Sequence, residues 1–404
     1  MADRTAASTA GGPPQRPAAL PSLTGLRWLA AVFVFLAHAS MLSGPNRPDA
    51  PLSFFADQDL AKGLAHFFEP GFVMVSFFFV LSGFVLTWST APGERTTAIW
   101  RRRALKVYPN HIVVFVVAMW LFASSEPTRA WLPNLFLVHT WSNKPEVISS
   151  VNLPAWSLCV EVFAYALFPL LLVLVRRIKE SRLWLWAGAM VAGVVGVPVV
   201  TQVFVSGGVR VPTYDLWMNQ LWFSYGFPPA RLFEFMLGMV LARIVAAGLW
   251  PRNIGMPASM VLFAAGYWLS FALPYPYKFY VGTIIPFAVL VCATAARDLR
   301  GEGGWLASRP MVHLGNVSFA FYLTQGVVMF YGRPKVWGAH TYGVVPALGM
   351  LAVLFLANLL AGWLLYRFVE LPIMRRFGRS RKRTAPAATR GPEAAAVSGV
   401  TGVA

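Results

Sequence analysis

The sequence predicts an all-α, polytopic membrane bundle with about ten transmembrane helices. Three observations support this fold class. The 404 residues are 57% hydrophobic and only 12% charged, about half the charged fraction of an average soluble domain. Long apolar runs recur along the chain, and Lys and Arg are shared unequally between the segments that separate them. Together these features exclude a soluble cytosolic enzyme, a disordered chain and a fibrous repeat.

The expected spans are apolar runs that can cross roughly 30 Å of hydrocarbon as helix, or nearly so. In chain order they are 24–42, 71–90, 108–124, 155–175, 183–205, 231–249, 254–273, 279–296, 311–331 and 344–368. The segment 131–140 is too short to cross, so we expect an interfacial or re-entrant piece there. One transmembrane domain, 21–378, is expected between two disordered cytoplasmic tails, 1–20 and the basic 379–404.

The basic residues predict the orientation. The loops on one side carry 24 Lys and Arg, whereas those on the other side carry eight. This bias predicts cytoplasmic termini and a multi-pass protein of the plasma or inner membrane. The net charge of +18 therefore reflects topology, and no nucleic-acid partner is expected. The two cysteines lie in apolar runs without metal-ligand spacing, so no metal site is expected either.

Ionisable side chains inside a bilayer are costly, which makes each of them a candidate functional residue. Arg27 and His38 lie eleven residues apart in the first span and so share one helix face, with Arg27 near the cytoplasmic end. The fourth span carries Ser157, Glu161 and Tyr165 as one polar stripe at i, i+4 and i+8. Glu161 needs a cation or a proton, and we expect His38 to be its partner. A purely structural ion pair is the alternative.

The first span also imitates a cleavable secretory signal, because a basic leader and an apolar core precede Ala37-His38-Ala39. We expect the span to be retained, since cleavage there would remove the His38 helix. We expect no soluble domain of useful size anywhere in the chain.

Two further spans and one loop carry polar candidates. Ser318, Tyr322 and Gln325 share a face of the ninth span, a pattern that suits either a binding site or hydrogen bonding between helices. Arg231 and Glu234 form an i, i+3 pair that we expect to neutralise itself.

The basic loop 101–109 contains Arg103 and Lys106. It is either a positive-inside anchor or an anion site at the cytoplasmic mouth beside Arg27. In the second span, the step Ser82-Gly83 permits close contact with another helix.

Seven segments in order resemble the signatures of the acyltransferase 3 family, over nearly all of 22–378. They are Arg27 with His38, Phe77–Phe84, Arg103 to Lys106 with Pro109, Trp156 to Glu161 with Tyr165, Arg231 to Glu234 with Gly238, Leu314 to Ser318 with Tyr322, and Val369 to Pro372. Two positions depart from the family pattern. Lys106 stands where an arginine is usual, which loses the planar bidentate fork, and Gln325 stands where histidine is common.

The resemblance implies a membrane O-acyltransferase. An acyl group, expected to be acetyl, would pass from acyl-CoA to a hydroxyl of a glycan, a lipid or a natural product such as a macrolide. Acyl-CoA would be a co-substrate, with no bound cofactor. A multi-pass transporter or flippase, using the same buried charges for passage, is the alternative class.

The resemblance also implies roles for the candidate residues. His38 and Glu161 would be catalytic, and Arg27, Arg103 and Lys106 would bind the phosphates of acyl-CoA. Candidates for contacting the substrate or the oxyanion are Ser82, Trp156, Ser157, Tyr165, Arg231, Glu234, Ser318, Tyr322 and Gln325.

Overall fold

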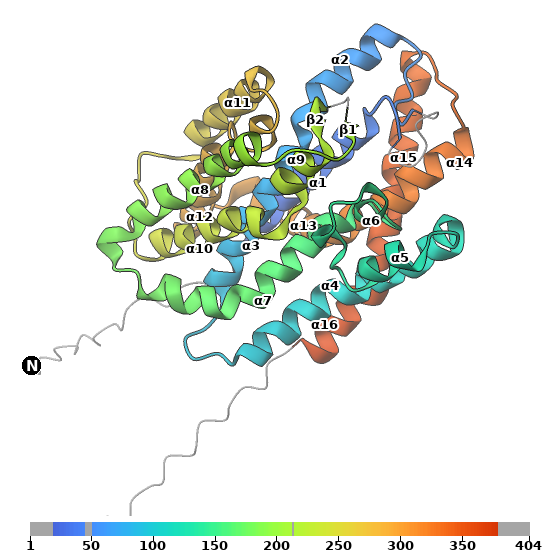
Figure 1. Ribbon diagram of the computed structural model, residues 1–404. Coiled ribbons are helices and arrows are strands. Elements are labelled where there is room, and N and C mark those ends of the chain that lie inside the picture. Colours follow the sequence, from blue (N-terminus) through green and yellow to red (C-terminus); the bar gives the residue numbers. More distant parts are fainter. Residues whose placement is uncertain (1–18, 45–50, 212–213, 379–404) are drawn as a thin grey trace, which may run out of the picture.

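The protein is a bundle of helices (Figure 1), which confirms the predicted all-α class. The structure is a computed structural model that describes residues 19–44, 51–211 and 214–378. Two strands of two residues, β1 (Arg210–Val211) and β2 (Leu216–Trp217), pair antiparallel. The expected tails lie outside the described residues, apart from residues 19 and 20.

Each expected span coincides with a long helix. In order these are α1 (Pro21–Ala39), α3 (Val73–Ser89), α4 (Thr96–Ala118), α7 (Ala155–Arg177), α8 (Leu183–Phe204), α10 (Leu232–Ala246), α11 (Met256–Ala272), α12 (Ile284–Leu299), α13 (Arg309–Gln325) and α15 (Val344–Leu365). Within the described ranges, seven helical stretches are long and apolar enough to cross a membrane. Helices α10, α11 and α13, with 15, 17 and 17 residues, are not among these stretches. Ten crossings and cytoplasmic termini therefore stay predictions.

Short helical elements connect or extend these helices. They are α2 (Gln58–Phe68), η1 (Glu69–Phe72), η2 (Met119–Ala123), α5 (Thr128–Leu135), η3 (His139–Trp141), α6 (Pro145–Ile148), η4 (Glu180–Arg182), α9 (Met218–Leu221), η6 (Trp222–Gly226), η7 (Pro228–Arg231), η8 (Tyr277–Phe279), η9 (Gly304–Ala307), η10 (Gly326–Gly332), α14 (Arg333–Trp337), η11 (Tyr366–Glu370) and α16 (Leu371–Phe377). The segment expected to be too short to cross contains only the end of α5 and the start of η3.

The basic segment that we expected to be a loop is part of α4, and this corrects the prediction. The helix begins at Thr96 and continues through Pro109. A proline removes one helical hydrogen bond, but membrane helices tolerate it where neighbouring groups satisfy the freed carbonyl. As a result, Arg103 and Lys106 lie three residues apart on one face of a helix, from which both reach the interior.

Helices α3 and α10 cross at close range, and this crossing depends on two glycines. A Cβ on Gly83 would lie 1.9 Å from the carbonyl oxygen of Phe235, and one on Gly238 would lie 1.9 Å from that of Val80. Neither position can accept a side chain without moving the helices apart. The Ser82-Gly83 step therefore permits close helix contact, as predicted.

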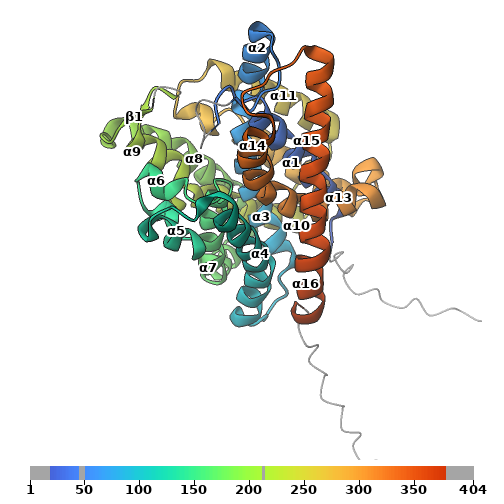
Figure 2. The same ribbon diagram turned by 90° about the vertical axis from the view of Figure 1, so that its right-hand side faces the viewer.

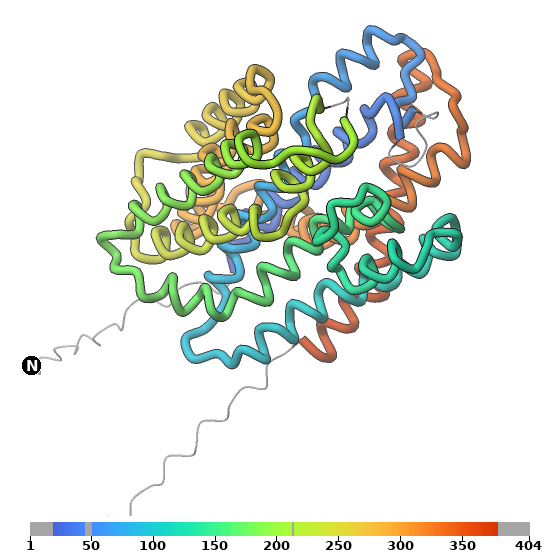
Figure 3. The backbone as a smooth tube through the Cα atoms, viewed as in Figure 1, coloured from blue at the N-terminus to red at the C-terminus, as the bar shows by residue number. Residues whose placement is uncertain are grey.

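Helix α1 runs through the interior of the bundle, where it packs against α3, α12 and α13 (Figure 3). The outer surface is apolar, with Trp120 81%, Phe204 79% and Val345 79% exposed. Such a surface is expected where lipid tails, not water, surround the helices. Helices α2 and α16 lie at opposite ends of the bundle (Figure 2).

Candidate active site

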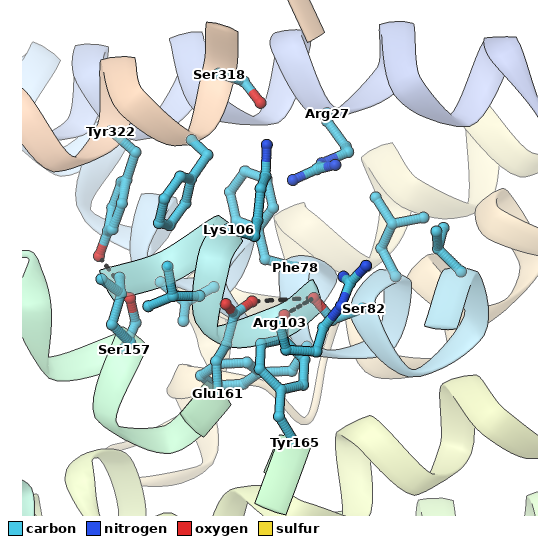
Figure 4. Close-up of a pocket in the computed structure, with 17 residues that line it drawn as sticks. Arg27, Phe78, Ser82, Arg103, Lys106, Ser157, Glu161, Tyr165, Ser318 and Tyr322 are labelled. Atoms are coloured by element: carbon cyan, nitrogen blue, oxygen red, sulfur yellow. Dashed lines mark hydrogen bonds between the residues drawn. The ribbon is translucent and has the colours of Figure 1, made fainter. Parts of the chain in front are cut away.

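A cavity lies between α1, α3, α4, α7 and α13, with about 860 Å³ of space that no atom fills, part of it open to solvent. Nine of the predicted site residues line it: Arg27, Ser82, Arg103, Lys106, Ser157, Glu161, Tyr165, Ser318 and Tyr322. Their side chains converge from helices far apart in the sequence (Figure 4).

The cavity carries an excess of positive charge. Arg27, Arg103 and Lys106 line it together with one carboxylate, Glu161. Among the described residues, neither arginine forms an ion pair with a carboxylate. The guanidinium of Arg103 lies 5.8 Å from the centre of the Tyr165 ring, and its Nε has no hydrogen-bond partner. Three cationic side chains that face one carboxylate at a cavity suit an anionic ligand.

Glu161 is held by a hydrogen bond from α3. The hydroxyl of Ser82 donates to Oε1 of Glu161 over 2.9 Å and lies 3.3 Å from the hydroxyl of Tyr165. Both contacts are drawn in Figure 4. Glu161 and Tyr165 share a face of α7 because they are four residues apart. The polar stripe predicted on the fourth span therefore does face the cavity.

Ser157 and Tyr322 form a second polar group on the cavity wall. Their hydroxyl oxygens lie 3.1 Å apart, and the hydroxyl of Tyr322 also donates to the carbonyl of Pro154 over 3.1 Å. Ser318 lines the same wall, where its hydroxyl donates to the carbonyl of Gly315 within α13. Each of these hydroxyls already has a hydrogen-bond partner in the structure, so a substrate would have to displace an existing contact to use them.

The expected contact between His38 and Glu161 is absent, and His38 has a different partner. Its Nδ1 lies 2.6 Å from Oε1 of Gln325, and its ring packs edge-on against Phe330. His38 does not line the cavity. The depth of both residues was predicted from residue counts, but the rotation of α1 about its axis was not. That rotation directs His38 to α13, not to α7.

His38 nevertheless lies next to the cavity. Gln325 follows Tyr322 by three residues on α13, which is about 4.5 Å along the helix axis. An amide oxygen only accepts hydrogen bonds, so the contact with Gln325 places a proton on Nδ1 of His38 and leaves the lone pair on Nε2. The amide nitrogen of Gln325 is buried and has no partner.

Three predicted site residues lie away from the cavity. Arg231 and Glu234 form a doubly hydrogen-bonded ion pair, with distances of 3.0 and 3.1 Å, and both are 1% exposed. The expectation that this pair neutralises itself is confirmed. Trp156 packs on the ring of Tyr225 at 4.6 Å, and does not line the cavity.

Sequence reasoning missed two kinds of residue. Apolar side chains complete the cavity wall, among them Val75, Phe78 and Phe319, and in an apolar sequence nothing distinguishes them from core residues. It also gave no role to Glu370, whose carboxylate binds Lys106 and Asn110 from behind the cavity wall. The signal that could have identified it was its place in the Val369–Pro372 segment, which resembles a family signature.

Comparison with known proteins adds a family to this geometry. The sequence profile described as "Acyltransferase domain" matches residues 20–367. The chain is 40% identical to "Acyltransferase MdmB" of Streptomyces mycarofaciens, over 92% of this chain and 96% of that protein. It is 25% identical to "Peptidoglycan O-acetyltransferase OatA" of Listeria monocytogenes, over 88% of this chain.

The chain is also 24% identical to "O-acetyltransferase OatA" of Staphylococcus aureus, over 89% of this chain. It spans 58% of that protein's length and 56% of the Listeria protein's. No solved structure matches. The profile covers most of the chain, and the first of these relatives is similar over almost its whole length. The protein is therefore a multi-pass membrane acyltransferase, and the chain belongs to the acyltransferase 3 family.

Proposed function

We propose that the protein is an O-acyltransferase of the plasma membrane that uses acyl-CoA, with acetyl as the acyl group, to esterify a hydroxyl of its acceptor. The observation that carries the proposal is the cavity in which Arg27 and Arg103 lack carboxylate partners and Lys106 lies beside them. The phosphates of CoA would supply the missing negative charges.

The acyl donor would lie along the cavity. Its phosphates would contact Arg27, Arg103 and Lys106, and the pantetheine arm would pass Glu161 toward Tyr322. This places the thioester one helical turn from Gln325 and its partner His38. The apolar walls formed by Val75 and Phe78 suit a short, uncharged arm.

The reaction follows from this placement. Nε2 of His38 accepts the proton as the acceptor hydroxyl attacks the thioester carbonyl. The tetrahedral intermediate then expels the thiolate of CoA, which receives the proton from His38, so an ester and free CoA leave. The unpartnered amide N–H of Gln325 is a candidate donor to the oxyanion. Glu161, the one carboxylate on the cavity wall, is a candidate second base.

The acceptor class follows from the relatives. The Listeria protein is named for peptidoglycan, which supports a hydroxyl of a cell-envelope glycan. The name of the more similar relative gives no acceptor. A lipid or a natural product such as a macrolide therefore remains in the proposed range.

Donor binding is the decisive experiment. Purified protein in detergent should bind CoA, and Arg27→Glu or Arg103→Glu should weaken the affinity by about ten-fold or more, because each loses a charge-assisted hydrogen bond. Arg177→Glu, at an exposed arginine at the end of α7, is the matched control and should bind as the wild type does. Wild-type affinity in both cavity variants would contradict the proposal.

Mass spectrometry identifies the acceptor. Envelope glycans, lipids and secreted metabolites are compared between cells that make the wild-type protein and cells that make His38→Ala. One species should lose 42 mass units, the mass that an acetyl group adds when it replaces a hydrogen. A different lost mass would identify another acyl chain.

A further inference from the structure

Glu370 is a buried carboxylate that lies behind the cavity wall and is 2% exposed. It is the last residue of η11, a π-helical turn between α15 and α16. The turn precedes Pro372, which has no N–H for the carbonyl of residue 368 and whose ring crowds that carbonyl. A wider turn accommodates this, and such turns occur frequently at functional sites. Glu370 lies three residues beyond the segment that matches the family profile.

Both oxygens of Glu370 bind α4. Oε1 accepts a hydrogen bond from the ammonium of Lys106, and Oε2 accepts one from the amide of Asn110 over 2.6 Å. Lys106 and Asn110 are four residues apart and so lie on one face of α4. Helix α16 lies beside α4 at this point (Figure 1). One carboxylate therefore fixes the last helix of the bundle to the helix that carries Arg103 and Lys106.

The ammonium of Lys106 lies between Glu370 and the cavity. Glu370 binds it on one side, and on the other it faces the cavity, 5.7 Å from the centre of the Phe319 ring. An ammonium has three N–H donors, so one bond to Glu370 leaves donors for a ligand in the cavity. A lysine side chain is flexible and loses much conformational entropy when a ligand fixes it. A partner that fixes it in advance removes that cost from binding.

We propose that Glu370 is a positioning residue for the acyl donor: it holds Lys106 at the cavity wall so that the remaining N–H donors of the ammonium face the phosphates of CoA. This inference rests on the function proposed above. It assigns a role to the C-terminal Val369–Pro372 segment, whose residues do not line the cavity.

A competing interpretation predicts the opposite effect on CoA affinity when Glu370 is removed. If Glu370 merely neutralises Lys106, it competes with the phosphates, and its removal should tighten CoA binding. If Glu370 positions Lys106, its removal should weaken CoA binding. The salt dependence of the CoA affinity also distinguishes the two interpretations. Each phosphate contact makes the affinity fall more steeply as ionic strength rises. Loss of the Lys106 contact should flatten that dependence, whereas release of a free ammonium should steepen it.

The experiment is calorimetric titration of the detergent-purified full chain with CoA at several salt concentrations. Glu370→Gln should weaken binding by about ten-fold and should flatten the salt dependence to that of Lys106→Met. The double variant should bind no more weakly than the worse single variant, because both changes remove one contact. Lys106→Arg keeps a cation for Glu370 and should bind within about two-fold of the wild type.

Glu94 supplies the matched control. It forms an ion pair with Arg102, which lies on α4 as Lys106 does. Neither Glu94 nor Arg102 lines the cavity. The hydrogen bond from Arg102 lowers the pKa of the Glu94 carboxyl, so this pair is charged at neutral pH. Glu94→Gln should leave both the CoA affinity and its salt dependence at wild-type values. A purely structural role for ion pairs on α4 would make the two glutamate variants behave alike.

The outcomes separate the two proposals. Weaker binding in Lys106→Met with unchanged or tighter binding in Glu370→Gln overturns the positioning role and keeps the donor site. Unchanged binding in Lys106→Met and in both arginine variants overturns the donor site itself. If Glu370→Gln does not fold, Asn110→Leu decides the question, because it removes only the second anchor of Glu370. That variant should bind CoA about three-fold more weakly, and wild-type affinity in it would refute the inference.

Discussion

His38 has an amide as its partner where a carboxylate was expected, and this changes how it can act. A carboxylate would stabilise the imidazolium that forms during base catalysis, whereas Gln325 contributes an oxygen that fixes the tautomer and the ring orientation. The position of Nε2 then depends on one hydrogen bond of 2.6 Å. Gln325 is therefore a positioning residue as well as a candidate oxyanion donor.

Substitutions at Gln325 should separate these contributions. Gln325→Glu keeps an acceptor for Nδ1 of His38 and should retain more activity than Gln325→Leu, which has a similar size and no acceptor. We expect Gln325→Leu to lower kcat by about 10²-fold, the effect of a misplaced catalytic group. His38→Ala should cost about 10²–10⁴-fold, the range for a lost general base. The measurement is turnover per folded molecule, with detergent melting temperature recorded alongside.

Two results would contradict this account of His38. Near wild-type kcat in a folded His38→Ala protein would remove it from the mechanism. Equal kcat in the Leu and Glu variants of Gln325 would show that the acceptor oxygen has no influence on His38. Donor affinity should stay unchanged in all three variants, because neither residue lines the cavity that we assign to CoA.

At the scale of elements, the Arg231–Glu234 pair joins η7 and α10 to the rest of the bundle. The Arg231 guanidinium also donates to Ser76 over 3.0 Å and lies 5.0–5.2 Å from the ring centres of Phe79, Tyr225 and Tyr280. A fully buried pair with this many partners holds helices together, and its removal leaves an uncompensated charge.

Glu234→Gln should therefore destabilise the fold and leave donor binding intact. Loss of one partner of a buried pair costs about 3–5 kcal/mol, which should appear as a marked fall in detergent melting temperature. The folded fraction should still bind CoA with wild-type affinity, since the pair lies away from the cavity. A thermally stable Glu234→Gln protein that fails to bind CoA would place the pair in the functional site instead.

The positions of the helices were predictable because hydropathy directly reflects burial in lipid. All ten expected runs coincide with helices. The residues Ser157, Glu161 and Tyr165, whose spacing predicted one polar face, all line the cavity. The start of α4 was missed because Arg101–Arg103 lower the local hydropathy even though the helix continues through them. Hydropathy detects apolar character, not helical continuity.

The partners of the buried charges were not predictable in the same way. They depend on how far each helix is rotated and how closely it packs, which the sequence expresses only indirectly. A rotation that directs His38 to Gln325, and a π turn that directs Glu370 to Lys106, both follow from packing between helices far apart in the chain. Spacing on one helix identifies a polar face, but it does not identify what that face meets.

At the scale of the whole molecule, the number of crossings decides where the two ends of the chain lie. Both termini are cytoplasmic only if the number is even, whereas the seven helical stretches that meet the length and hydropathy requirement would place them on opposite sides. The three expected spans outside these stretches, α10, α11 and α13, therefore determine the topology. Each packs against other helices of the bundle, and a bilayer can thin locally around a short span.

Cysteine labelling of intact cells tests this, and Arg252, between α10 and α11, is the decisive position. The native Cys159 and Cys292 are buried, so single introduced cysteines report cleanly to an impermeant maleimide. Lys62→Cys and Val209→Cys, at exposed outer positions, should be labelled from outside. Arg95→Cys and Arg252→Cys should be labelled only after permeabilisation, because the basic loops face the cytoplasm.

External labelling at Arg252 would mean that α10 does not cross. The Arg231–Glu234 pair would then lie on a re-entrant segment, and the predicted ten-span topology would be wrong.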